Sequence, residues 1–548
     1  MSEEKKLDKQ EILRHSTAHA LAAAVLEMFP ETKFGTGPAT ENGFYYDFML
    51  PRTLIPEDLE ILEEKMREIV KANHSFEKEE ISIESAIEHF EKISQHYKVE
   101  LIKDLQKEGN ETVSVYKTGG FVDLCSGPHL DSTGEINFTA FKLTKISGAY
   151  WRANENNDQM QRIYGVVFAD KKGLKDYLNR VEEAKKRDHR KLGKELDLFT
   201  FSNRVGPGLP LFTPKGTIIK DELQKHIEDV CRKRGFQKVS TPHLAKIDLY
   251  STSGHRDKFG DELFHVTSKH KQDYVLRPVQ CPHQTQIYAS KPRSYKDLPI
   301  RYMESSSQYR AEKPGEIGGL NRVIAITVED GHSFCRVDQV KDEVKNVIEI
   351  IKDFYSSIGL WENHWVSLSV RDYNHPEKYI GDSKDWDKCE EMLQEISDEM
   401  KLDAKKCEGE AALYGPKLDF MFKDAMGREI QIPTVQLDFA TPQRFELEYT
   451  NDKGEKETPV MVHRAILGSY ERFLMLLIEH FAGAFPTWLS PVQTSIVPVS
   501  EKLESCKFGE TKIFIHLGSN LIETNYSIDA NQDVLNKIKA LLGENSIQ

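Results

Sequence analysis

The chain has 548 residues, of which 39% are hydrophobic and 30% are charged, and its formal net charge is −14. This length accommodates three or four domains, each large enough to bury a core of its own. The acidic balance argues against a chain that coats nucleic acid nonspecifically, so an RNA partner has to be inferred from particular residues. No apolar run approaches the roughly 20 residues that a membrane-spanning helix requires, so we expect a cytoplasmic protein with no membrane partner.

The seven cysteines are scattered singly and their number is odd. A disulfide framework is therefore not expected, and individual thiols are candidates for metal binding or catalysis. Cys125 and Cys281 stand out because each lies in a motif rich in histidine or charge. The others are interpreted as small buried apolar residues, namely Cys231, Cys335, Cys389, Cys407 and Cys506.

The first predicted element is a helix from Leu7 to Phe29, with apolar residues at helical spacing. His15 and His19 stand four residues apart, so both project from one face of this helix. Cys125 and His129 repeat the same spacing in VDLCSGPHL. By residue type, these four side chains could form a metal site like that of a zinc hydrolase, or a pocket for proton transfer.

Two further helices are predicted between the first helix and residue 200. One is charged and amphipathic, from about Pro56 to Ala72. The other, from Leu174 to Leu198, has apolar residues too sparse for a deep core and is typical of a solvated connecting helix. Its basic cluster KKRDHRK could contact RNA phosphates or simply be solvated. After Gly206-Pro207-Gly208 the composition changes, and a helix from about Lys215 to Arg234 leads to a strand ending at Pro242.

The segment from Val275 to Phe334 holds the most candidate functional residues. In it, two runs of alternating apolar and polar residues flank a Pro/Gly-rich loop. This pattern predicts a hairpin with Arg310 on one arm, Arg322 on the other and Glu312 at the bend. Two guanidinium groups fixed on a sheet suit a polyphosphate or a carboxylate, because each donates two parallel hydrogen bonds and keeps its charge. The glutamate could accept from an exocyclic amine or hold a metal ion. Pairing with surface acids is the alternative explanation for each arginine.

The last strong patterns are an antiparallel pair and a helix. Leu413 to Phe422 and Glu429 to Phe439 are expected to pair around the turn Asp424 to Arg428. VMVHRAILGSYERFLMLLIEHF then predicts a glycine break and a long apolar helix, with Arg472 on its first turns. The tail that follows could form a strand or two and a helix.

Several of these motifs together resemble the class II aminoacyl-tRNA synthetases, and specifically the threonyl-tRNA synthetases. YRAEKPGEIGGLNR is similar to the second signature motif of the class, and LGSYERF at 467 to 473 is similar to its third. RPVQCP, EDGH and VMVHRAILGS match the segments that carry the three zinc ligands of the family. HSTAH and DLCSGPH resemble its editing domain. The similarity runs from about residue 10 to 495, and the motifs occur in the family order.

The resemblance implies an α+β multidomain protein, in which a class II antiparallel sheet flanked by helices follows an α+β editing domain. The expected domains are editing in 1–175, a connecting helix in 176–200, catalysis in 201–490, and a truncated or degenerate anticodon-binding region in 491–548. A ubiquitin-like domain ahead of the editing domain is not expected. The segment 206–242 resembles the first motif of the class, which implies a homodimer.

In the implied reaction, L-threonine and ATP give threonyl-adenylate and pyrophosphate, and the threonyl group then passes to tRNA(Thr), with hydrolysis of seryl-tRNA(Thr) as a correction. Positioning and electrostatics dominate such chemistry. Residues implied in binding ATP are Arg310, Glu312, Arg322, Lys417, Gln431 and Arg472, and Mg²⁺ would bridge phosphate oxygens of the ATP. The catalytic set among these is Arg310, Lys417 and Arg472. Threonine would be held by Arg310, Asp330, Tyr414 and Gln436. One Zn²⁺ would be held by Cys281, His332 and His463. A metal-free editing pocket would be lined by His15, His19, Asp123, Cys125, His129 and Lys142.

The zinc has a clear purpose in this scheme. Threonine and valine are nearly isosteric, so an apolar pocket separates them poorly, whereas a site that must bind the hydroxyl rejects valine strongly. Three protein ligands leave an open metal face that the amino and hydroxyl groups of threonine can fill together. Serine has the same two groups, so an editing pocket is needed on the same chain.

Some positions depart from the commonest family pattern. They are Gln280 for asparagine, His283-Gln284 for Gly-His, Ile324 for arginine, Ile326 for an aromatic residue and Val328 for glutamine. Loss of the aromatic contact to adenine is expected to weaken ATP binding by roughly 1 kcal/mol.

Two other functions stay open: a tRNA-binding paralogue without aminoacylation, and a factor that only edits misacylated tRNA in trans.

Overall fold

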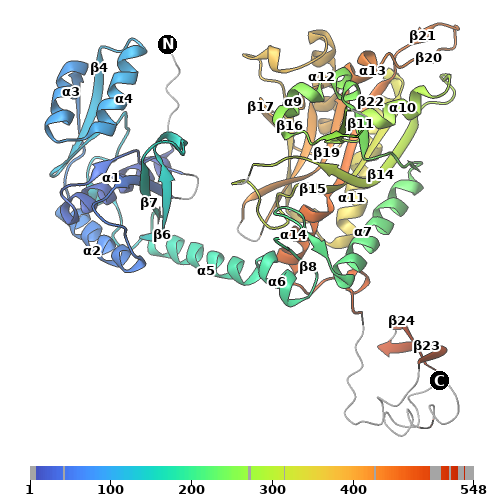
Figure 1. Ribbon diagram of the computed structural model, residues 1–548. Helices are drawn as coiled ribbons and strands as arrows, with labels where there is room; N and C mark the ends of the chain where they lie inside the picture. The colour runs from blue at the N-terminus through green and yellow to red at the C-terminus, as the bar shows by residue number, and fades with distance from the viewer. Residues whose placement is uncertain are drawn as a thin grey trace. The chain divides into compact units, whose positions relative to one another are not determined.

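Two compact units make up the computed structural model of the chain, residues 1–182 and 183–548 (Figure 1). The structure describes residues 8–40, 43–269, 273–313, 315–424, 427–493, 508–517, 520–528 and 536. The division between the units falls inside α5 (Lys171–Arg187). Within the described residues, no helix combines the length and the apolar composition needed to cross a membrane.

In the first unit, α1 (Lys9–Met28) is the central helix. Its middle, residues 16–25, is buried, because an alanine-rich stretch lets it pack closely on α2 (Pro56–Ala72) and on an antiparallel sheet of order β1-β2-β7-β6. A second antiparallel sheet has the order β3-β4-β5. The other elements are β1 (Lys33–Phe34), β2 (Phe44–Met49), β3 (Glu77–Ser82), α3 (Ile83–Lys92), α4 (His96–Lys107), β4 (Thr112–Thr118), β5 (Phe121–Leu124), β6 (Phe141–Tyr150) and β7 (Gln159–Val167).

The second unit is built on a sheet whose strands have the order β10-β14-β15-β22-β19-β18-β16-β17. Neighbouring strands run antiparallel except at the two edges, where β10 joins β14 and β17 joins β16 in parallel. Its strands are β10 (Gln237–Lys238), β14 (Ile300–Tyr309), β15 (Ala325–Cys335), β16 (His364–Val370), β17 (Lys405–Glu408), β18 (Lys417–Lys423), β19 (Glu429–Asp438) and β22 (Val460–Ser469).

Helices and short strands lie before, between and after these strands in the sequence. The helices are α6 (His189–Glu195), α7 (Pro214–Lys233), α8 (Ile247–Ser253), α9 (His255–Phe259), α10 (Cys281–Ala289), α11 (Val340–Ile358), α12 (Ser383–Glu399), α13 (Ala440–Arg444) and α14 (Tyr470–Phe481). The remaining strands are β8 (Phe199–Thr200), β9 (Leu211–Phe212), β11 (Leu244–Lys246), β12 (His265–Thr267), β13 (Asp273–Leu276), β20 (Tyr449–Thr450), β21 (Lys456–Glu457), β23 (Phe508–Leu517) and β24 (Asn520–Ile528). β23 and β24 pair antiparallel, in the tail where a strand or two was predicted.

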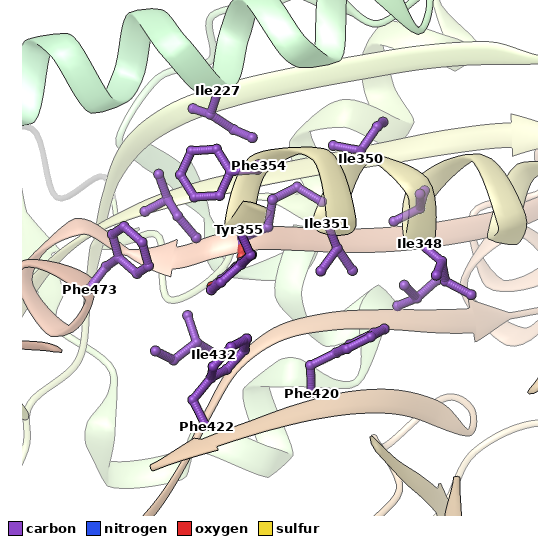
Figure 2. Packing of buried hydrophobic residues seen from close by; sticks show 14 of the residues in the cluster. Ile227, Ile348, Ile350, Ile351, Phe354, Tyr355, Phe420, Phe422, Ile432 and Phe473 are labelled. Atoms are coloured by element: carbon purple, nitrogen blue, oxygen red, sulfur yellow. The ribbon is translucent and has the colours of Figure 1, made fainter. Parts of the chain in front are cut away.

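The main core lies between one face of the sheet and α11, as Figure 2 shows. Phe354 and Tyr355 of α11 are fully buried there, and the Tyr355 ring stacks on Phe422 of β18 with centroids 4.6 Å apart. The Tyr355 hydroxyl donates to the Ile466 carbonyl at 3.0 Å, so its polar end is satisfied. Burying each side chain of this size contributes about 1.5–3 kcal/mol relative to leaving it exposed.

The alternation of side chains along the central strands separates this core from the functional face. Val462 of β22 and Val435 of β19 belong to the main core. Their neighbours His463 and Gln436 therefore point to the opposite face, where they lie directly across from each other. His332 of β15 is the cross-strand partner of His463 on its other side. Three polar side chains are thus aligned across three strands.

The predicted hairpin is present as β14 and β15, with Tyr309 opposite Ala325. Its arginines are not on the arms, which corrects the prediction. Arg310 follows the end of β14, and Arg322 precedes the start of β15. Both lie in the connecting segment, because a local bridge between Gly318 and Arg322 takes the chain out of the ladder. Alternation of apolar and polar residues cannot distinguish paired strand from extended loop.

The predicted connecting helix is broken. Asp188 interrupts it with extended backbone and caps α6, because its side chain accepts from the Arg190 N–H at 2.8 Å. Other predicted helices match closely, including 56–72 and 215–234, where α7 spans Pro214–Lys233. Cys231, Cys335 and Cys389 are buried in the main core, as predicted. Cys407 is only partly buried, contrary to the prediction, because it lies on the edge strand β17. Residue 506 lies outside the described residues.

Candidate functional sites

The predicted metal ligands meet on the functional face of the large sheet. Cys281 begins α10, and His332 and His463 face each other on β15 and β22. Their ligand atoms lie within 4.8 Å of one another, and all three residues are buried. The two imidazole rings stand edge to face with centroids 4.7 Å apart. Residues more than 180 positions apart in the sequence are therefore brought to one point by strand register.

Hydrogen bonds fix which nitrogen of each histidine faces this point. His332 Nδ1 lies 2.7 Å from Gln284 Oε1, so Nδ1 carries the proton and donates. His332 Nε2 is buried and has no hydrogen-bond partner among the described residues. His463 Nε2 is 2.8 Å from Asp438 Oδ2, which leaves Nδ1 for a metal. Outer partners of this kind hold metal-binding histidines in the correct tautomer.

The residues present fit a zinc ion. A buried imidazole nitrogen without a partner is costly unless an ion or ligand occupies the point toward which it is directed. One thiol and two imidazoles are a donor set typical of a catalytic zinc with an open coordination position. Burial raises the pKa of Cys281 well above its ordinary value, helped by Asp330 and Asp438. A bound cation would reverse this effect by favouring the thiolate.

The predicted threonine-binding side chains surround the same point. The Tyr414 hydroxyl donates to Gln436 Oε1 at 2.6 Å, and its ring stacks on His463 with centroids 4.5 Å apart. Asp330 Oδ1 is 3.8 Å from His332 Nε2. Burial raises the pKa of Asp330 to about 7. The structure thus gathers Asp330, Tyr414 and Gln436 around the metal ligands.

The connecting segment of the β14–β15 hairpin brings acidic and basic groups together. Arg322 Nε donates to Glu312 Oε2 at 2.6 Å, and Arg322 also pairs with Glu316 at 2.9 Å. The Arg310 guanidinium lies over the Phe259 ring, 4.9 Å from its centroid, and Nε contacts the Pro278 carbonyl at 3.4 Å. Burial lowers the pKa of Arg310, against the opposing effect of Glu312. It stays charged because guanidinium groups remain protonated in proteins.

Arg472 lies on the first turn of α14, which Ser469 caps. Its Nε is buried without a hydrogen-bond partner among the described residues. Burial lowers the pKa of Arg472, and the positive charge of Arg322 lowers it further. Two arginines that repel each other across a partly buried space, with one donor unpaired, suit an anionic ligand.

Lys417 and Gln431 converge on a carboxylate that the sequence did not single out. Asp419 of β18 is buried, and its oxygens lie 2.7 Å from Lys417 Nζ and 2.6 Å from Gln431 Nε2. Ser369 donates to the same carboxylate at 2.8 Å. Asp419 therefore fixes the position of both predicted nucleotide-binding side chains.

The short helix α9 is a second feature that sequence reasoning missed. Its Phe259 supports Arg310, and its His255 ring lies 6.2 Å from the Tyr414 ring. Partial burial lowers the pKa of Lys258, and the charges of Arg310 and Lys417 add to this effect. The only signal in the sequence was the cluster of charged and aromatic residues at 255–259, which a surface helix would also have.

A separate cluster in the first unit contains the two four-residue pairs. His15 Nε2 and His129 Nε2 each lie 3.3 Å from Cys125 Sγ. The His129 ring is 4.2 Å from the ring of His15 and 4.1 Å from that of His19, centroid to centroid. The ligand atoms of all four lie within 4.8 Å of one another, so a metal site is sterically possible here.

Burial keeps this cluster neutral. It lowers the pKa of His15, His19 and His129 and raises that of Cys125 to about 12. The Ser16 hydroxyl accepts from the Leu130 N–H at 3.0 Å and lies 3.1 Å from His129 Nδ1. A neutral thiol is a poor nucleophile. The imidazoles are instead equipped to exchange protons with a water molecule.

Asp123 anchors the cluster from β5. It lies 2.5 Å from Lys98 Nζ, accepts from the Tyr46 hydroxyl at 2.6 Å, and is 3.5 Å from His19 Nε2. Lys98 and Tyr46 have no signal in the sequence, because they reach the site only through packing. Lys142 lies on β6 with its ammonium 3.8 Å from Glu63 Oε1, and its place in the pocket stays a prediction.

Comparisons with known proteins agree with this arrangement. Residues 264–481 match the tRNA synthetase class II core domain (G, H, P, S and T), and residues 113–164 match the threonyl and alanyl tRNA synthetase second additional domain. A threonine–tRNA ligase from Gloeobacter violaceus is 47% identical over 500 residues, covering 90% of this chain and 79% of the relative. The chain belongs to the threonine–tRNA ligase family. Another threonine–tRNA ligase, from Listeria welshimeri, is 46% identical over 489 residues, covering 89% of this chain and 76% of the relative.

Solved structures of the threonine–tRNA ligase family agree in fold. The RNA binding domain of threonyl-tRNA synthetase from Cryptosporidium parvum is 35% identical, with a TM-score of 0.53. The match covers 56% of this chain and 75% of that one. The predicted resemblance and fold class are confirmed: a class II core and an editing-type domain occur on one chain.

Proposed function

We propose that the second unit activates L-threonine with ATP and charges tRNA(Thr), and that the first unit hydrolyses seryl-tRNA(Thr). The observation that carries this proposal is the meeting of Cys281, His332 and His463 beside Tyr414 and Gln436. It supports a site that recognises a small amino acid by its hydroxyl group.

In the first step, the carboxylate of threonine attacks the α-phosphorus of ATP, and pyrophosphate leaves. Arg310 neutralises charge on the carboxylate and the α-phosphate, whereas Arg322 and Arg472 hold the outer phosphates together with Mg²⁺. Glu312 accepts from the amine of adenine, and the pair of Lys417 and Gln431 completes the pocket. The unpaired Nε of Arg472 supports this assignment, because a phosphate oxygen would satisfy it.

In the recognition of threonine, Cys281, His332 and His463 would hold a Zn²⁺ ion, which would supply an electrophilic contact for the amino and hydroxyl groups. Asp330 then accepts from the substrate hydroxyl, and Tyr414 and Gln436 flank the amino group. Valine offers no hydroxyl, so these buried polar groups would be left unpaired and valine would be rejected. Serine carries the same amino and hydroxyl groups, so this site does not reject it.

The second unit passes serine on to tRNA as an ester, which the first unit removes. Neutral His15, His19 and His129 position and polarise a water molecule against the ester carbonyl, while Cys125 stays a thiol. Asp123 orients His19 through the contact at 3.5 Å. Lys142 balances the charge that develops on the ester oxygen. This pocket works without a metal; the zinc-hydrolase alternative would need an ion bound by the same four side chains.

The remaining boundaries and partners are part of the same proposal. The editing domain spans 1–175, the connecting helix 176–200 and the catalytic domain 201–490, with an anticodon-binding region in 491–548. A homodimer is supported by an apolar surface around β8, β9 and the start of α7. Its side chains are at least 40% exposed, namely Phe201, Val205, Leu211 and Ile218.

Threonine-dependent exchange between ATP and pyrophosphate tests the proposal directly. The native chain should catalyse exchange, and Cys281→Ser should abolish it. A chain that deacylates seryl-tRNA but gives no exchange would instead be a trans-editing factor. A chain that binds tRNA and does neither would be the paralogue without aminoacylation.

A further inference from the structure

His189 joins three segments of the second unit that are distant in sequence. It lies at the start of α6 and is only 6% exposed. Its Nδ1 lies 2.7 Å from Glu479 Oε1 on α14, and its Nε2 accepts from the Leu320 N–H at 3.1 Å. Glu479 has no proton to give as a carboxylate, so Nδ1 is the protonated nitrogen and Nε2 the acceptor. Both nitrogens are therefore used, in a single tautomer.

The Leu320 N–H belongs to the loop that carries Glu312 and Arg322. Within this loop the Gly318 N–H donates to the Arg322 carbonyl at 3.2 Å, which closes a tight turn. The Leu320 side chain is fully buried in the main core, so it anchors the turn from one side. His189 anchors it from the other side, through the backbone.

The contact also explains why Gly319 stands beside it. Gly319 has a φ of +55°, and a Cβ added there would lie 2.2 Å from His189 Nε2. The backbone can approach the imidazole this closely only because the residue has no side chain. The loop and the histidine are thus built to fit each other.

We propose that His189 is a positioning residue for ATP: it fixes the turn at 318–322 and so holds Arg322 against Glu312. This inference rests on the proposed function of that loop in binding ATP. Arg322 lies two residues beyond Leu320, so movement of the turn carries its guanidinium away from the Glu312 carboxylate, now 2.6 Å from Arg322 Nε. A displacement of about 1 Å is enough to impair a positioned charge. His189 does not itself touch the nucleotide.

Two amide variants, each matching the position of one ring nitrogen, separate the two hydrogen bonds of His189. In His189→Gln, the amide oxygen reaches the position of Nε2 and can still accept from the Leu320 N–H. In His189→Asn, the amide reaches only the position of Nδ1, so it keeps the contact to Glu479 and loses the loop. Each variant gives up one buried hydrogen bond, so both should lose thermal stability, and His189→Gln should lose at least as much because its lost bond is to a carboxylate.

The test compares these variants in full-length protein by ATP/pyrophosphate exchange and by amide hydrogen exchange. KM for ATP should rise about tenfold in His189→Asn and stay within about twofold of native in His189→Gln, as expected for one buried hydrogen bond lost or kept. KM for threonine should be unchanged in both. The Leu320 amide should lose protection in His189→Asn only.

Equal changes in KM for ATP in the two variants, or a Leu320 amide that stays protected in His189→Asn, would overturn the inference. The amide exchange measurement needs no activity. If native protein gave no pyrophosphate exchange, the proposed function would fail, whereas Leu320 protection would still decide whether His189 holds the loop.

Discussion

At the scale of single residues, the two histidines proposed to bind zinc, His332 and His463, differ in the groups behind them. Asp438 supports His463 with a carboxylate, whereas Gln284 supports His332 with an amide. The nitrogen of the Gln284 amide is buried without a partner among the described residues. Because the described part of the chain offers this amide no other hydrogen bond, its orientation depends on the His332 N–H. The support of His332 is therefore the weaker of the two.

Gln284→Leu should reduce zinc affinity by about 10–100-fold, the usual effect of removing such an outer partner. Leucine has a similar size but cannot accept from His332 Nδ1, so the imidazole is free to adopt the wrong tautomer. Competition with a coloured chelator measures the affinity. Gln286→Leu is the matched control, because Gln286 lies on the same helix and is exposed. Native zinc affinity in Gln284→Leu would refute this role.

Arg472 illustrates a trade between stability and binding. Its buried, unpaired Nε and its repulsion from Arg322 cost free energy until an anion is bound. Arg472→Met should therefore stabilise the ligand-free protein by on the order of 1 kcal/mol, and weaken ATP binding by at least tenfold. Thermal unfolding with and without ATP measures both effects. Destabilisation of the ligand-free variant would contradict this account of Arg472.

At the scale of elements, periodicity and motif spacing predicted much of the site but not its supports. The four-residue spacing of His15 and His19 placed both on one face of α1, and the structure confirms that they meet His129. Lys98 and Glu479 could not be predicted in the same way. Each is an ordinary charged residue of an amphipathic helix, and its role arises only from the packing of that helix against a distant segment.

The buried His19 of α1 makes the first unit sensitive to acid. Burial holds the pKa of His19 well below its usual 6.5. Below pH 6.5 the unfolded state therefore binds more protons than the folded state, and the free energy of unfolding decreases as the pH is lowered. The contribution of His19 to the free energy of unfolding is complete above pH 6.5, and below pH 6.5 it decreases by about 1.4 kcal/mol for each pH unit. Amide exchange of residues 16–25 at pH 7 and pH 5.5 measures this loss.

The matched variant is His19→Gln, which keeps a polar side chain but cannot titrate in this range. It should show a smaller loss between pH 7 and pH 5.5 than the native chain, with His15 and His129 responsible for the remainder. Equal acid sensitivity in the two proteins would mean that His19 is not held neutral by burial.

At the scale of the whole molecule, the proposed threonine site and the histidine cluster belong to different compact units of the chain. A substitution within one unit should leave the contacts within the other unit intact, because the effects of substitutions that share no partners are nearly additive. Activation and editing should therefore be separable by mutation.

Cys281→Ser and Cys125→Ser form a reciprocal pair that tests this separation. Cys281→Ser should contain no zinc at its catalytic site and give no threonine-dependent exchange, yet hydrolyse seryl-tRNA(Thr) at the native rate. Cys125→Ser should keep native exchange and lose editing by about tenfold or more, because the contacts at 3.3 Å to His15 and His129 change length and strength. The zinc content per chain decides whether the histidine cluster holds a metal. Native protein and Cys125→Ser should each hold one zinc per chain. Two zinc ions in native protein, falling to one in Cys125→Ser, would show that the histidine cluster is a metal centre and that hydrolysis there is not metal-free.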